Sequence, residues 1–154
     1  MPIATLRRTV TAPHRYVWDW LADFGALDKL HPPGNLTEFS CEGNHVGARR
    51  FARFNPALGV EGQIIERLDV VHEPHVIVYS IVENYPLPMT DYVAVVTLAA
   101  GAGATTEVSW EGHYTEGALP AAQMDPMLID FYELFLGNIE KAHALGRKVG
   151  ESPY

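Results

Sequence analysis

Cysteine and long apolar runs are the features that this 154-residue sequence has least of. Cys41 is the single cysteine, so no internal disulfide can form, and such a composition fits a reducing compartment. No apolar run reaches the roughly 18 residues that a membrane-spanning helix needs. Residues 1–12 also lack the apolar segment of a secretory signal. We therefore expect a cytoplasmic protein with no membrane span.

Positive charge is scarce as well. The chain has 11 Lys and Arg against 19 Asp and Glu, a formal net charge of −8. Binding of a polyanion relies on an excess of Lys and Arg, so we expect no nucleic-acid partner. The proportions of hydrophobic residues (47%) and charged residues (19%) are typical of soluble globular proteins. The length fits one domain, residues 1–154, with one core.

Motifs for metals, cofactors and nucleophiles are missing. The segment His72-Glu73-Pro74-His75 brings two histidines close in sequence, but Pro74 prevents the helix that would place both on one face. Gly101-Ala102-Gly103 lacks the third glycine of a dinucleotide-binding turn. Cys41 has no neighbours that would activate a nucleophile. We therefore predict no metal, no cofactor and a simple turn around Pro74.

The most regular pattern lies near the carboxyl end, where residues 125–146 are predicted to form a long amphipathic helix. Asp125-Pro126 suits an N-cap followed by the first helical residue, and Gly146 suits the left-handed residue that ends a helix. Such a helix is roughly 30 Å long, enough to cross a small domain. The apolar residues recur at steps of three and four: Met124, Met127, Leu128, Phe131, Leu134, Phe135, Ile139, Ala142 and Leu145.

The rest of the chain reads mainly as strand. Residues 3–10 alternate as a first strand, Pro13 opens a short helix, and residues 26–30 form a second helical turn. Six strands are then predicted at residues 36–42, 48–54, 60–71, 76–83, 92–99 and 105–115. Strands in succession followed by a helix favour an α+β fold with an antiparallel sheet. We expect the long helix to lie in that curved sheet.

The faces of the strands predict one buried charge. Glu66 shares its parity with Ile64 and Leu68, so it points inward. A buried carboxylate needs a partner, and Arg49 or Arg50 on the preceding strand can supply it, although only one of them can face inward. A structural ion pair at the sheet rim and a pair that faces a ligand both remain open. For Asn138, within the apolar arc of the long helix, bonding to a loop carbonyl is favoured over anchoring a ligand.

Aromatic residues are concentrated on the presumed inner surfaces. Filling the core is the default for any single one. A strongly bent sheet around one helix, however, cannot close at both ends and tends to leave a slot between them. The inner aromatic set comprises Trp18, Phe24, Tyr79, Tyr92, Trp110, Tyr114, Phe131 and Phe135.

The segment from Trp18 to Leu27, followed by His31-Pro32, resembles the opening of the START/Bet v 1-like (SRPBCC) superfamily in its polyketide cyclase/dehydrase and lipid-transport branch. Residues 47–49, 66–69, 79–81, 86–92 and 131–133 continue the resemblance in register. It implies a helix-grip fold: a seven-stranded antiparallel sheet gripping the C-terminal helix, with two short helices after the first strand and an apolar ligand cavity. Leu30 departs from the pattern, which usually has Trp before His-Pro.

Three functions are compatible with these features. The first is binding or transport of a hydrophobic or aromatic small molecule in the internal cavity. The second is a polyketide cyclase or dehydratase with Glu66 as general base and Arg49 with Tyr79 stabilising an oxyanion. The third is a protein-interaction module with a filled core. A homodimer is left open. The candidate ligand-binding residues are Trp18, Phe24, His31, Arg49, Glu66, Tyr79, Tyr92, Trp110, Phe131 and Phe135.

Overall fold

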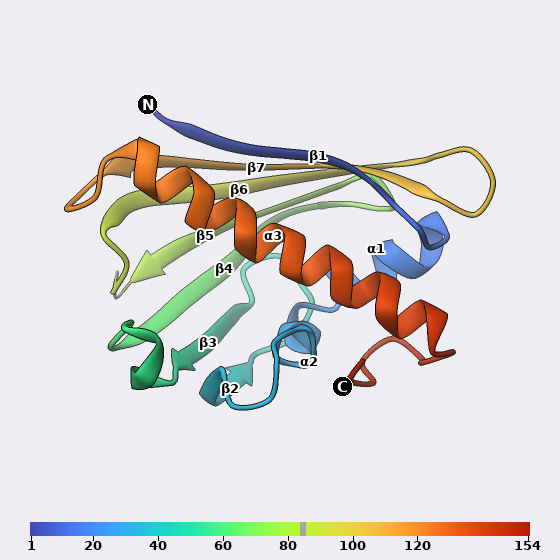
Figure 1. Cartoon of the computed structure of the whole chain (residues 1–154), viewed down its shortest axis with the longest axis horizontal. Coiled ribbons are helices and arrows are strands. Elements are labelled where there is room, and N and C mark those ends of the chain that lie inside the picture. The colour runs from blue at the N-terminus through green and yellow to red at the C-terminus, as the bar shows by residue number, and fades with distance from the viewer. Residues whose placement is uncertain (84–85) are drawn as a thin grey trace.

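The structure is a computed structural model that describes residues 1–83 and 86–154. It consists of one curved sheet with a long helix across one face (Figure 1). In chain order the elements are β1 (Ile3–Val10), α1 (His14–Ala22), the 3-10 turn η1 (Phe24–Ala26), α2 (Leu27–Leu30), β2 (Leu36–Cys41), β3 (Arg49–Phe54), the 3-10 turn η2 (Pro56–Leu58), β4 (Gln63–His72), β5 (Val76–Glu83), β6 (Met89–Ala100), β7 (Thr106–Glu116) and α3 (Ala121–Ala144).

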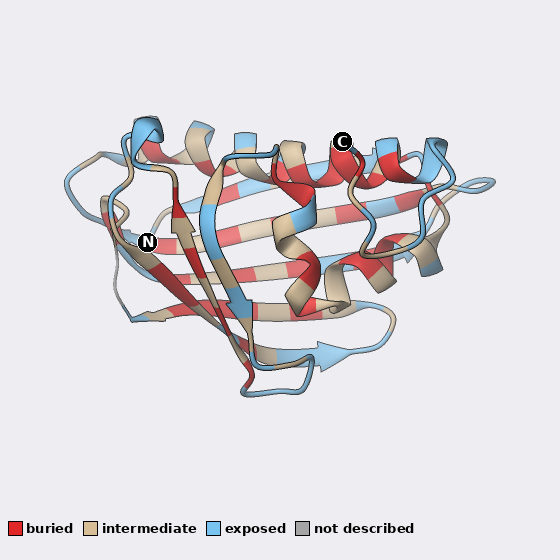
Figure 2. Ribbon diagram, turned by 90° about the horizontal axis from the view of Figure 1, so that it is seen from below, coloured by how far each residue is buried: buried red, intermediate tan, exposed pale blue. Residues whose placement is uncertain are grey.

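The seven strands form a single antiparallel sheet in the order β1-β7-β6-β5-β4-β3-β2. Each strand from β2 to β7 pairs with its neighbour in sequence, and β1 adds to the free edge of β7. The sheet curls, and buried residues alternate with less buried ones along its long strands (Figure 2). The α+β helix-grip fold with two short helices after the first strand is therefore confirmed.

The aromatic residues expected on the inner surfaces of two strands are buried. These are Trp110 and Tyr114 on β7 and Tyr79 on β5. The strand predicted at residues 60–71 starts three residues later, at Gln63. Gly62 has a φ of +107°, which is outside the extended region, so the strand cannot begin before Gln63.

The predicted start of α3 is wrong. The helix begins at Ala121, after the extended Pro120, and Pro126 lies inside it. The first turn is closed before Pro126, with the N–H of Met124 donating to Pro120 O at 3.0 Å. Asp125 does not cap the helix and instead accepts a hydrogen bond from the Tyr114 hydroxyl.

The end of α3 matches the expectation. Gly146 has a φ of +70°, and the N–H of Arg147 donates to Ala142 O at 2.9 Å, as in a Schellman motif. The buried face of the helix differs in part from the predicted one. Leu145 is 51% exposed, whereas Tyr132 and Leu136 are buried at 2% and 0%.

Two further contacts fix the ends of the fold around the core. Asn138 donates to Leu30 O at 2.7 Å and to the Tyr154 hydroxyl at 2.9 Å, so the interpretation of Asn138 as a partner of a loop carbonyl is confirmed. Within the two described ranges, no helix is both long and apolar enough to cross a membrane.

Candidate functional site

A buried ion pair joins two neighbouring strands on the inner face of the sheet. Arg50 on β3 lies directly opposite Glu66 on β4. Arg50 Nε donates to Glu66 Oε1 at 2.8 Å, and the two side chains are 6% and 13% exposed. The guanidinium carbon of Arg50 lies 3.9 Å from the ring centre of Phe24 and 4.9 Å from that of Tyr79. The inward orientation predicted for Glu66 is thus confirmed.

The structure corrects the choice of arginine. Arg49, named as a candidate site residue, lies on the outer face, where its Nε donates to Glu42 Oε1 at 3.0 Å. Its side chain is 41% exposed. Successive residues of a strand point to opposite faces, so the inward position of Arg50 requires Arg49 to point outward. The pocket residue is Arg50.

An inner pocket of about 70 Å³ lies between the sheet and the helices α2 and α3. A water molecule needs roughly 10–15 Å³ of such space, so the pocket has the size of several waters or of a small ring. Its polar lining residues are those of the ion pair, three tyrosines and one histidine. The full lining is Leu27, His31, Arg50, Ala52, Phe54, Ile64, Glu66, Tyr79, Ile81, Leu87, Met89, Tyr92, Leu128, Phe131, Tyr132 and Phe135.

A smaller pocket of about 20 Å³ adjoins the inner pocket and shares Arg50 and Tyr79 with it. Besides Tyr79, two of the predicted site residues line this smaller pocket: Phe24 and Trp110. Six of the predicted site residues line the inner pocket: His31, Glu66, Tyr79, Tyr92, Phe131 and Phe135.

Trp18 lines neither of these pockets, and this candidate is corrected. It is 2% exposed and belongs to the hydrophobic core. Trp20, which the sequence reasoning missed, lines the smaller pocket instead. Val17, Trp18 and Trp20 are all buried on α1, so the helical period alone does not distinguish a tryptophan in the core from one beside a pocket.

A pair of buried tyrosines forms one wall of the inner pocket. The hydroxyls of Tyr92 on β6 and Tyr132 on α3 are 2.6 Å apart. A bulge in β6 turns Tyr92 inward: Thr90 pairs with Thr115 and Val93 with His113, which leaves an extra residue, and Asp91 has a φ of +55°.

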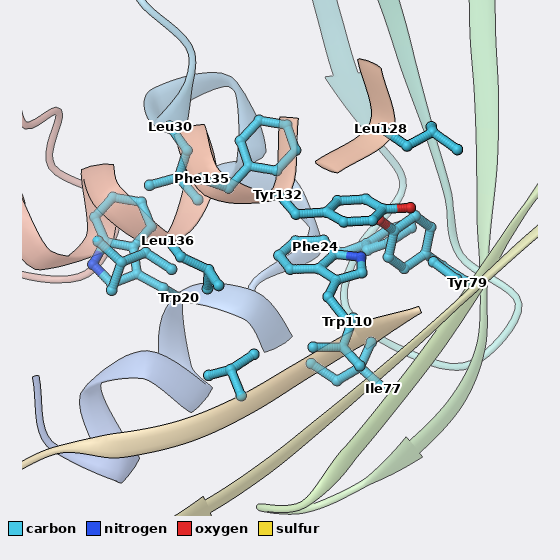
Figure 3. Packing of buried hydrophobic residues seen from close by; sticks show 14 of the residues in the cluster. Trp20, Phe24, Leu30, Ile77, Tyr79, Trp110, Leu128, Tyr132, Phe135 and Leu136 are labelled. Atoms are coloured by element: carbon cyan, nitrogen blue, oxygen red, sulfur yellow. The ribbon is translucent and has the colours of Figure 1, made fainter. Parts of the chain in front are cut away.

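Tyr132 lies flat on Trp110, with ring centres 4.8 Å apart and an interplanar angle of 10° (Figure 3). Tyr79 lies beside this stack (Figure 3). Burial raises the pKa of Tyr79, Tyr92 and Tyr132 above the ordinary phenol value. These phenols therefore stay protonated at neutral pH and serve as hydrogen-bond donors, not as bases.

The comparisons with known proteins agree with the helix-grip fold. Residues 1–144 match the family model described as polyketide cyclase / dehydrase and lipid transport. The chain belongs to this family. No curated protein matches the sequence significantly.

Three solved structures show the same fold. A Bacillus thuringiensis protein is 21% identical with a TM-score of 0.74, and the match covers 93% of this chain and 99% of that chain. Norcoclaurine synthase from Thalictrum flavum is 16% identical with a TM-score of 0.75, covering 93% and 86%. A Thermobifida fusca protein is 25% identical with a TM-score of 0.69, covering 94% and 97%.

His31 lines the inner pocket of this family member beside Phe54 and Phe135. It is 5% exposed, and its ring lies edge-on to those of Phe135 at 5.0 Å and Phe54 at 5.8 Å. Burial, together with the charge of Arg50, lowers the pKa of His31 to about 4. His31 is therefore neutral at pH 7 and adds no charge to the pocket.

The family description covers cyclases, dehydrases and lipid carriers, so membership alone does not choose between catalysis and binding. The site offers a carboxylate, a guanidinium and protonated phenols around an apolar space. Within the part of the chain that the structure describes, no group of three or more His, Cys, Asp or Glu side chains is arranged to hold a metal ion.

Proposed function

We propose that this protein binds a small hydrophobic or aromatic molecule in the inner pocket between the sheet and α3. The observation that carries the proposal is a buried ion pair, Arg50–Glu66, at the wall of a pocket lined otherwise mostly by apolar side chains. Sites for small organic ligands combine an apolar lining with a few placed polar groups. The homodimer left open by the sequence stays a prediction.

Energetics support a ligand role for the ion pair over a purely structural one. A buried ion pair is on average no more stabilising than well-packed apolar side chains of the same volume. Ala52 lies between Arg50 and Phe54 on the inner face of β3 and leaves the space that a larger residue would fill. A fold selected only for a dense core needs neither a buried ion pair nor an unfilled space beside Ala52.

The experiment is a titration with toluene followed by the methyl NMR signals of Ala52, Ile64 and Leu128, all of which line the inner pocket. Saturable shifts of these signals are expected. Ala52→Leu should abolish binding by filling the pocket, whereas Ala99→Leu, at an exposed position of β6, should leave it unchanged. Absence of saturable shifts in the unmodified protein would refute the proposal. Native mass spectrometry of protein purified from its own host then identifies the physiological ligand by its mass.

A second candidate function is proton-transfer catalysis of the cyclase or dehydratase type. It is favoured by the placement of Glu66 beside phenols that remain protonated. Glu66 would take a proton from the carbon next to a carbonyl, and the charge that moves to the carbonyl oxygen would be stabilised by Arg50 and Tyr79. Arg50 takes the role for which the sequence had suggested Arg49.

Acetophenone in D₂O tests this second function, because exchange of its methyl protons reports enolisation directly by NMR. An enzyme should accelerate the exchange, and Glu66→Gln should remove the acceleration while toluene still binds. Equal exchange rates with and without the protein would leave binding as the function. Glu42→Gln is the matched control, since Glu42 pairs with Arg49 on the outer face.

A further inference from the structure

Gly112 on β7 provides the space in which the tyrosine pair sits. A Cβ atom at this position would lie 2.2 Å from the Tyr132 hydroxyl and 2.9 Å from Cε2 of Tyr92. Trp110, two residues earlier on the same face, carries the ring of Tyr132. The phenol of Tyr132 therefore lies along β7 from Trp110 to Gly112, and any side chain at position 112 would displace the two hydroxyls.

The tyrosine pair has a hydroxyl hydrogen left over. Each phenol has one hydrogen, and the bond between Tyr92 and Tyr132 uses one of the two. The ring centre of Tyr79 is 6.3 Å from that of Tyr92. If the Tyr79 hydroxyl is counted with the pair, one hydroxyl hydrogen is still left without an acceptor. A chain of hydroxyls always has one more hydrogen than it has internal bonds. One O–H of this wall is thus available as a donor.

Glu66 supplies a matching acceptor. Arg50 Nε bonds to Oε1, and Oε2 accepts no hydrogen bond from residues 1–83 or 86–154. The carboxylate and the phenols line the same inner pocket. The charge of Glu66 also contributes to the raised pKa of Tyr92 and Tyr132, so the carboxylate lies near the pair. The inner pocket therefore presents both a neutral donor and an acceptor. A hydroxyl group, which donates once and accepts as well, satisfies both at the same time.

We propose that the Tyr92–Tyr132 pair over Gly112, together with Glu66, selects a ligand that carries a neutral hydroxyl on a small ring. This inference rests on the proposed binding function and names the ligand class that the site takes. A hydrocarbon of the same shape leaves the donor and the acceptor unpaired in a buried site, which lowers its affinity. A ligand with a fixed charge pays for desolvation without gaining a buried counter-charge, because Arg50 and Glu66 already neutralise each other.

The test compares 4-methylphenol with 1,4-dimethylbenzene, which differ only by a hydroxyl in place of a methyl group. NMR titration of the unmodified protein should give a dissociation constant at least roughly tenfold lower for the phenol. Equal affinities would overturn this inference and leave the binding function intact. If neither compound binds, both the inference and the proposed function fail.

Variants assign the preference to these residues. Tyr92→Phe combined with Tyr132→Phe keeps both rings and removes both hydroxyls of the pair, so the preference for the phenol should fall to about threefold or less. Tyr132→Phe alone should retain the preference, because it leaves the Tyr92 hydroxyl free to donate. Gly112→Ala should have the same effect as the double variant by displacing the pair. Tyr114→Phe is the matched control: Tyr114 is buried but bonds to Asp125 and does not line the inner pocket, so the preference should persist. Circular dichroism of each variant verifies the fold. A preference unchanged in the folded double variant Tyr92→Phe with Tyr132→Phe would refute the inference even if Gly112→Ala does not fold.

Discussion

Two adjacent arginines of β3 make the same chemical contact in opposite surroundings. Arg49 Nε lies 3.0 Å from Glu42 Oε1, with side chains 41% and 43% exposed. Arg50 Nε lies 2.8 Å from Glu66 Oε1, with side chains 6% and 13% exposed. The distances differ little. What differs is water, which screens the outer pair and is largely excluded from the inner one.

This difference assigns different roles to the two pairs. In the outer pair, the hydrogen bond from Arg49 lowers the pKa of Glu42, but exposed pairs of this kind contribute little to stability. In the inner pair, each charge depends on the other because neither is fully solvated. Removing one partner of the inner pair therefore lowers the unfolding free energy strongly, although the intact pair adds little to it. The position of the inner pair at the pocket wall fits the proposed ligand-binding role.

The largest effect is expected from breaking the inner pair alone. Glu66→Ala leaves Arg50 buried without a counter-charge and should cost about 3 kcal/mol of unfolding free energy. Urea denaturation measures this loss. Glu42→Ala, its counterpart on the outer face, should barely move the urea midpoint. Similar losses for both variants would show that burial does not distinguish the pairs.

A pH dependence of similar size is expected from His31. Its pKa of about 4 lies below the ordinary value of 6.5, so between these values the unfolded chain binds more protons than the folded one. Stability is full above about pH 6.5, falls as the pH decreases, and levels off below about pH 4, a loss of about 3 kcal/mol. His31→Gln should flatten this part of the profile in urea titrations at several pH values, whereas the exposed His45→Gln should not.

The same histidine reports on the inner pair. Burial is the main cause of the lowered pKa of His31, and the charge of Arg50 is the second. Arg50→Met should therefore raise the pKa of His31 partway toward its ordinary value, and Arg49→Met should leave it unchanged. NMR titration of the imidazole signals measures both. An equal shift in the two variants would contradict the inward assignment of Arg50.

Replacing both partners of the inner pair should have a smaller effect on stability. Arg50→Met with Glu66→Leu leaves no unpaired charge, so the unfolding free energy should return to within about 1 kcal/mol of the unmodified protein. Affinity for 4-methylphenol should nevertheless decrease, because the acceptor Oε2 is gone. Stability recovered together with an unchanged preference for the phenol would assign the pair a structural role only.

The smallest effect concerns the outer pair and salt. Any loss of thermal stability in Glu42→Gln should disappear at high ionic strength, because mobile ions screen exposed charges. The destabilisation by Glu66→Ala should remain at the same salt concentration. Thermal unfolding at low and high salt measures the contrast, and a salt-sensitive Glu66 variant would place the inner pair in contact with solvent.

Much of the site could be read from local pattern. The alternation along β4 placed Glu66 on the inner face, and the aromatic positions of β7 followed from the same period. Gly112 was overlooked, although a glycine between Trp110 and Tyr114 inside a strand signals a close approach by another group. Tyr132 was missed because the helical period placed Phe131 on the inner face and did not reveal how far α3 is rotated over β7.

The sequence by itself determined the α+β class, the end of the long helix at Gly146 and the need for a cation beside Glu66. Only the tertiary structure decided which arginine meets that need. Each face of β3 carries one phenylalanine, Phe51 on one and Phe54 on the other. The local pattern therefore does not predict which face is buried. The register with β4 sets Arg50 opposite Glu66, and hydrogen bonding between strands distant in sequence fixes that register.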